Sequence, residues 1–189
     1  MDFGPFLLLA LMEGTVQAAV LALTAVGLSL VFGVMRVVNV AHGEFFMLGA
    51  VAAWFVTFHL PGPAWAVFLA ALVIAPLAVA GVAAVADRLV LKRLHYEPEA
   101  VIVATIGLSY MLQQAALSFY GPDARPVAAP FTLRLQLPWF GYSGYKIAVV
   151  AAAVLLLLAV WLVMTRSRAG LVMRATQMDG ETARAFGID

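Results

Sequence analysis

The feature that most constrains this chain is a series of apolar stretches, each long enough to cross a lipid bilayer. A helix needs about 20 residues to span the hydrocarbon core. Four stretches reach about this length without one charged side chain: Thr15–Val34, Ala64–Ala86, Ala100–Tyr120 and Ile147–Met164. Because backbone polar groups find no partners in lipid, such stretches are expected to be helical. The sequence therefore predicts an all-α, polytopic transmembrane helix bundle.

Composition supports this prediction and excludes other classes of protein. The chain is 65% hydrophobic and 11% charged, whereas a soluble domain is roughly 45–50% apolar and about 25% charged. Lipid is therefore expected to cover much of the surface. No basic stripe with interleaved aromatics suggests a nucleic-acid partner, and the absence of cysteine excludes disulfides and thiolate metal sites. We expect one membrane domain over residues 1–189.

A fifth apolar stretch is shorter than the other four. The apolar stretch Phe45–Leu60 reaches only about 24 Å at ~1.5 Å per residue. To cross the membrane it must lie in a thinned bilayer or begin earlier, which would carry Asn39, His42 and Glu44 to the membrane boundary. With this segment counted, the sequence predicts about five spans.

Orientation follows from the distribution of the 11 lysine and arginine residues. With five spans, eight lie on the side of the first loop and the tail: Arg36, Arg88, Lys92, Arg93, Arg166, Arg168, Arg174 and Arg184. Three lie on the other side: Arg125, Arg134 and Lys146. Because cytoplasmic loops carry the excess of basic residues, the N-terminus is predicted outside and the tail, residues 166–189, in the cytoplasm.

The run from Asn39 to Glu44 is the most polar stretch beside a span. Ionisable groups at membrane depth are costly and are functional candidates by default. On a continuous helix Asn39, His42 and Gly43 would share a face, while Glu44 would point roughly 140° away. A break near Gly43 would bring the polar groups together, as in transporter sites, whereas a short cytoplasmic turn would leave them solvated. Both interpretations stay open on these grounds.

A metal site is not expected here. His42 and Glu44 supply at most two ligands, and His59 and His95 fall in opposite loops. The polar residues Gln113 and Gln114 lie in Ala100–Tyr120, the fourth of the five predicted spans. They are expected to form interhelical hydrogen bonds or to line a polar solute pathway.

The tail contains a periodic pattern of mostly small residues. Ala175, Asp179, Ala183 and Gly187 recur every four residues. On a helix they would form one narrow stripe that another protein could approach closely. A solvated loop is the alternative.

Two stretches are specific enough to compare with known proteins. The run Val38–Ala50 contains Asn-Val-Ala-His-Gly-Glu, and Ala104–Ser109 is followed by Gln113. Both resemble membrane segments of LivH-type permeases of branched-chain amino acid ABC importers; the paralogous LivM type has a different run at the first position. The basic loop Asp87–Pro98 and the tail Gly170–Ile188 also resemble that family, the tail being similar to its ATPase-docking loop.

This resemblance implies a non-catalytic transport subunit of the inner (plasma) membrane that holds no cofactor. Family members pair with a second, LivM-like permease subunit and two cytoplasmic ATP-binding subunits, and a periplasmic binding protein delivers the solute. It also implies a broken second helix. The residues implied to lie near the translocation path are Asn39, His42, Gly43, Glu44 and Gln113. Those implied to couple to the ATPase are Arg174, Ala175, Asp179, Ala183 and Gly187.

Other functions remain open at this stage. Permeases for urea and short-chain amides are closely similar, and a secondary transporter or channel would also place polar residues in the membrane. A membrane enzyme using His42 and Glu44 lacks a second converging ionisable cluster. Because such permeases continue with further spans after the coupling loop, the chain is also expected to be a C-terminally truncated fragment.

Overall fold

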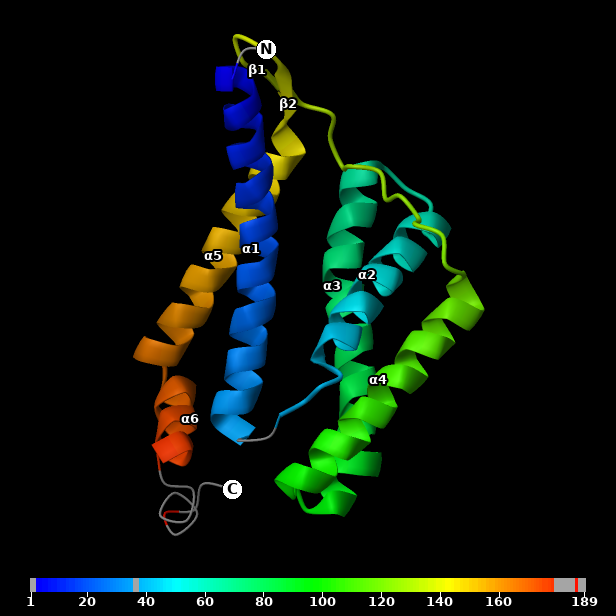
Figure 1. Ribbon diagram of the computed structural model, residues 1–189, viewed down its shortest axis with the longest axis vertical. Helices are drawn as coiled ribbons and strands as arrows, with labels where there is room; N and C mark the ends of the chain where they lie inside the picture. The colour runs from blue at the N-terminus through cyan, green and yellow to red at the C-terminus, as the bar shows by residue number, and fades with distance from the viewer. Residues whose placement is uncertain (1–2, 36–37, 179–185, 187–189) are drawn as a thin grey trace. The chain divides into compact units, whose positions relative to one another are not determined.

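The structure is a computed structural model that describes residues 3–35, 38–178 and 186. The chain divides into two compact units, which are treated separately. Unit 1 comprises Met1–Arg36 with Thr132–Asp189, and unit 2 comprises Val37–Phe131. Both consist almost entirely of helix (Figure 1). The predicted all-α architecture is confirmed.

Unit 1 is built on two long helices that lie side by side, α1 (Phe3–Met35) and α5 (Gly144–Arg166) (Figure 1). A short helix, α6 (Arg168–Met178), follows α5 and contacts both. α1 begins twelve residues before the predicted span, since Phe3–Met12 is also apolar. Its one charged residue, Glu13, forms an ion pair with Lys146 of α5 at 2.5 Å.

A small β-hairpin precedes α5 in the same unit. Strand β1 (Arg134–Gln136) pairs antiparallel with β2 (Gly141–Ser143), Leu135 lying opposite Tyr142. An all-α bundle was predicted, so the hairpin is an addition to the predicted elements. Strands of three residues leave too short an alternation to detect.

Unit 2 contains three helices. α2 (His42–His59) and α3 (Ala64–Ala86) pack together as a hairpin around the Pro61-Gly62-Pro63 turn, with Gly49 facing Val79. α3 continues through a π-helical turn, η1 (Asp87–Leu91), and a 3₁₀ turn, η2 (Lys92–Leu94). α4 (Pro98–Tyr120) then contacts α2. Pro98 is at its first turn, where the missing N–H is tolerated.

Four helices of the described residues are long and apolar enough to span a membrane: Phe3–Gly33, Ala64–Leu94, Pro98–Tyr120 and Gly144–Arg166. Each contains one of the four uncharged stretches or nearly all of it, so the helices predicted for these stretches are confirmed. Only 0% to 17% of their most apolar windows is buried within the chain. The exposed apolar surface is suited to lipid or to other helices.

α2 differs from the other long helices. Its 18 residues extend about 27 Å at ~1.5 Å per residue. It is continuous from His42, so no break occurs at Gly43; the chain instead turns at Val40 and Ala41, before the helix begins. A crossing by α2 therefore stays a prediction.

Candidate functional site

The turn before α2 is built by Asn39. Its side-chain Oδ1 accepts a hydrogen bond from the backbone N–H of Ala41 at 3.0 Å. The N–H of His42 donates to the Asn39 carbonyl at 3.3 Å, and that of Glu44 donates to the Ala41 carbonyl at 3.0 Å. An asparagine that bonds to the backbone two residues on is a turn-forming device. Asn39 thus ends the extended segment and starts the helix.

This turn is fastened to α4 through a buried hydroxyl. The backbone N–H of Val40 donates to Thr105 Oγ1 at 3.2 Å, and Thr105 Oγ1 donates to the carbonyl of Ile102 at 3.1 Å. Ala41 is 0% exposed and Thr105 1%. A buried polar group is costly unless it is paired. The two hydrogen bonds of the Thr105 hydroxyl therefore satisfy both this side chain and the backbone N–H of the turn.

A second contact joins the same two segments one turn further along α4. Ser109 Oγ donates to Glu44 Oε1 at 3.2 Å. Thr105 and Ser109 lie on one face of α4 because they are four residues apart. Glu44 is in the first turn of α2, where the helix dipole favours a negative charge. The two sequence motifs, 65 residues apart, therefore meet in one polar junction.

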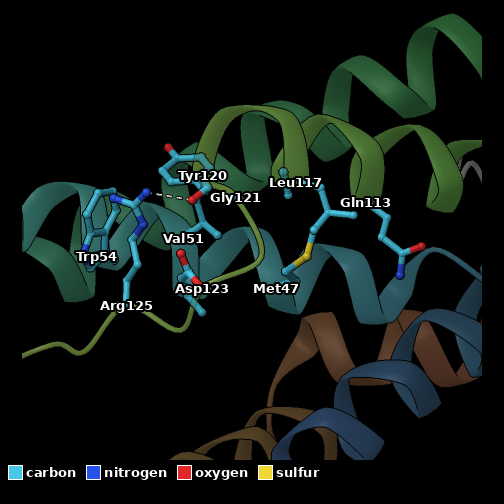
Figure 2. Close-up of a pocket in the computed structure, with 11 residues that line it drawn as sticks. Met47, Val51, Trp54, Gln113, Leu117, Tyr120, Gly121, Asp123 and Arg125 are labelled. Carbon is cyan, nitrogen blue, oxygen red and sulfur yellow. Dashed lines mark hydrogen bonds between the residues drawn. The ribbon is translucent and has the colours of Figure 1, made fainter.

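A cavity of about 440 Å³ lies between α2 and α4. Figure 2 shows that α2 contributes Met47, Val51 and Trp54, while Gln113 and Leu117 come from α4. Gln113 is eight residues after Thr105 and so lies near the face that carries the polar junction. Beyond Gln113 the wall of the cavity is apolar. Polar groups of the loop that follows α4 lie at the other end of the cavity.

The sequence model of the family described as "branched-chain amino acid transport system / permease component" matches residues 10–189. The chain belongs to this permease family. It is similar to the high-affinity branched-chain amino acid transport system permease protein BraD of Pseudomonas aeruginosa, with 26% identity over 193 residues. That match covers 95% of this chain but only 62% of BraD. No solved structure gives a significant match.

The permease structure brings some of the predicted path residues together. Asn39 and Glu44 both belong to the junction on α4, and Gln113 lines the adjoining cavity. His42 is half-buried as the first residue of α2. Gly43 is exposed, and an added Cβ would meet nothing within 4 Å, so packing gives no reason for glycine there. A role in transport for these residues stays a prediction.

The coupling residues are described only in part. Arg174 and Ala175 lie on α6, where Arg174 Nε donates to the Gly170 carbonyl at 3.3 Å. Asp179, Ala183 and Gly187 lie outside the described residues. A Cβ on Gly170 would collide with the carbonyl oxygens of Val163 and Met164. Glycine is therefore required where the first turn of α6 lies close against the last turn of α5.

Of the residues that line the cavity, only Gln113 was predicted as a site residue; Trp54, Asp123 and Arg125 are among those that were not. Arg125 had been counted only as one of the basic residues outside the membrane. A charged pair within five residues of the end of a span was the available signal, but it does not reveal that the loop folds back over α2. Among the residues that the structure describes, no group of three His, Asp or Glu side chains is placed to hold a metal ion.

Proposed function

We propose that this permease chain is a non-catalytic, membrane-spanning subunit of an ATP-driven importer in the inner (plasma) membrane, and that its solutes are branched-chain or similar amino acids. The family match over residues 10–189 is the observation that carries the proposal. Its partners would be a second, LivM-like permease subunit, two cytoplasmic ATP-binding subunits and a periplasmic binding protein. A subunit of this kind moves solute and leaves ATP hydrolysis to its partners.

The translocation path is proposed to follow α2 and α4, past Asn39, His42, Gly43, Glu44 and Gln113. The polar junction supports this assignment, since polar side chains in a membrane-embedded chain are costly and usually face a cavity. The hydroxyls of Thr105 and Ser109 fix the start of α2 on α4. Movement of α4 would therefore carry the start of α2 with it.

The orientation is proposed to be N-terminus outside and C-terminus in the cytoplasm, with α2 as the fifth crossing. α2 packs along α3 as a helical hairpin (Figure 1), which favours a crossing over a short surface helix. Without that crossing, the basic tail would still be cytoplasmic, but the N-terminus would be cytoplasmic as well. Labelling of a cysteine placed at Asp2 by an impermeant reagent on intact cells separates the two topologies. Protection of that cysteine would contradict five spans.

Residues 166–189 are proposed as the coupling segment. The tight contact of Gly170 with the end of α5 supports this role, because a force on α6 would be passed directly to a membrane span. We expect Arg174→Glu and Asp179→Lys to reduce ATP-driven transport while the chain still inserts into the membrane. Arg134→Gln, in the hairpin before α5, is the control for loss of a basic residue. Full transport by both tail variants would contradict the assignment.

The transport activity itself is tested in vesicles that contain the full importer and its binding protein. We expect labelled leucine to accumulate only when the ATP-binding subunits hydrolyse ATP. Accumulation with hydrolysis-deficient subunits would indicate a secondary transporter. Uptake of urea but not of leucine would indicate an amide permease instead.

A further inference from the structure

One end of the cavity between α2 and α4 carries a fixed positive charge. Arg125 Nη2 donates to the carbonyl of Tyr120, the last residue of α4, at 2.7 Å. The guanidinium carbon also lies 4.7 Å from the centroid of the Trp54 ring, a cation–π contact. These two contacts hold the side chain at the cavity. A guanidinium has five N–H donors, so most of them remain to bind an anion.

A negative charge lies on the same loop. Gly121 ends α4 with φ +78°, a left-handed conformation that favours glycine, and the chain then returns over α2. Asp123 lines the cavity beside Val51, as Figure 2 shows. Within the part of the chain that the structure describes, Asp123 forms no ion pair, with Arg125 or with any other basic residue. The two charges therefore do not neutralise each other.

Apart from Gln113, the remainder of the cavity is apolar. Met47, Ala50 and Val51 form one wall, and Ala116 and Leu117 form the other. Trp54 and Tyr120 line one end and form an edge-to-face contact with 5.5 Å between ring centroids. A cavity of about 440 Å³ is large enough for a small solute with part of its hydration shell.

We propose that this cavity is a binding site for a zwitterionic α-amino acid with an apolar side chain. Arg125 binds the carboxylate, Asp123 binds the ammonium group, and the side chain lies between Met47, Val51 and Leu117. A neutral solute such as urea would use neither charge. This inference rests on the proposed transport function and adds a specific recognition site to it.

The test uses the complete importer in lipid nanodiscs without its binding protein, so that only the membrane subunits can bind solute. The probe is labelled leucine at equilibrium. We expect Arg125→Gln and Asp123→Asn each to raise the Kd for leucine roughly tenfold to a hundredfold, as expected when one charged hydrogen bond is lost. Arg134→Gln, a matched loss of one positive charge in the β-hairpin, leaves the Kd unchanged.

Two analogues of leucine test the contacts of Arg125 and Asp123 separately. Leucinamide keeps the ammonium group but lacks the carboxylate, so Arg125→Gln should change its affinity little while Asp123→Asn weakens it. 4-Methylpentanoate lacks the ammonium group and should show the reverse pattern. Because Arg125 also contacts Trp54, ATPase activity of the Arg125→Gln complex serves as the check on folding.

The outcomes separate the site from the transport function. If wild-type vesicles accumulate leucine but the variants bind it with unchanged Kd, the site is wrong and the function stands. If the wild-type complex transports leucine yet binds none of it in nanodiscs, the site is likewise wrong. If wild-type vesicles fail to accumulate leucine, the proposed function itself fails.

Discussion

The two compact units of this permease connect their helices by different chemistry. In unit 1, α1 and α5 are joined by an ion pair between Glu13 Oε1 and Lys146 Nζ at 2.5 Å, across 133 positions of sequence. In unit 2, the start of α2 is attached to α4 by the hydroxyls of Thr105 and Ser109. One connection uses two full charges, and the other uses neutral donors with one carboxylate.

The difference determines how each connection responds when one partner is removed. Thr105 accepts from Val40 and donates to Ile102, so its hydroxyl is satisfied within the junction. Loss of that hydroxyl leaves the backbone N–H of Val40 without its partner. Loss of Lys146 leaves an unpaired charge on a helix that carries no other charged residue. Removing one partner from the neutral junction should therefore lower the free energy of unfolding only slightly. Removing one partner from the ion pair should lower it more.

The largest effect is expected from Lys146→Met, which leaves Glu13 unpaired. An isolated charge within a span costs about 2–3 kcal/mol or more, but both side chains are some 40% exposed in this chain (42% and 41%), so solvent reduces the effect. We expect a loss of about 1–2 kcal/mol in the free energy of unfolding. Unfolding in mixed detergent micelles, followed by circular dichroism while the SDS fraction rises, measures it.

The double variant Glu13→Lys, Lys146→Glu is the matched control for the ion pair. It reverses both charges and keeps the attraction, so it should recover most of the lost stability. Equal destabilisation by the single and the double variant would show that packing, and not charge, joins α1 to α5.

An intermediate effect is expected from Thr105→Val, which keeps the shape of the side chain and removes its hydroxyl. The N–H of Val40 then lacks its partner, at a cost of about 1 kcal/mol. Thr105→Ser retains the hydroxyl and should preserve the junction. Hydrogen exchange of the Val40 amide measures the contact directly: it should become faster in the valine variant only. If exchange at Val40 is equally slow in both variants, the hydroxyl does not hold the turn.

The predictable parts of the fold are those that the bilayer dictates. Uncharged stretches such as Ala64–Ala86 and Ala100–Tyr120 became helices with nearly the predicted ends, since the required length leaves little choice. The extension of α1 back to Phe3 was missed because Glu13 looked like the edge of a span. Its partner Lys146 lies 133 positions away, and no local pattern links the two.

The candidate site was predictable in part for a similar reason. Asn39 and Glu44 stood out because polar residues beside a span are unusual, and the Thr105–Ser109 spacing marks one helix face. Their meeting depends on tertiary packing of α2 against α4, which spacing alone does not specify. Asp123 and Arg125 reach the cavity through the turn at Gly121, whose backbone conformation is visible only in the structure.

The smallest effect is expected from Tyr142→Phe, which tests whether the ion pair needs its neighbour. Tyr142 is 3% exposed, and its hydroxyl has no hydrogen-bond partner among the described residues. Its ring lies 5.7 Å from Lys146 Nζ. Because phenylalanine keeps the ring and removes an unpaired buried polar group, the free energy of unfolding should stay within about 1 kcal/mol of wild type, or rise.

The pH dependence of Tyr142→Phe gives this small effect a distinct signature. Burial raises the pKa of Tyr142, and the negative charge of Glu13 raises it further. In the unfolded chain a tyrosine titrates near pKa 10, so stability should fall above about pH 10 as only the unfolded state releases the proton. Phenylalanine has no proton to lose, and the variant should resist this alkaline loss better than wild type. If the two proteins unfold identically at alkaline pH, the hydroxyl of Tyr142 is solvated in the folded state. The ion pair between Glu13 and Lys146 would then join the helices without a buried aromatic ring beside it.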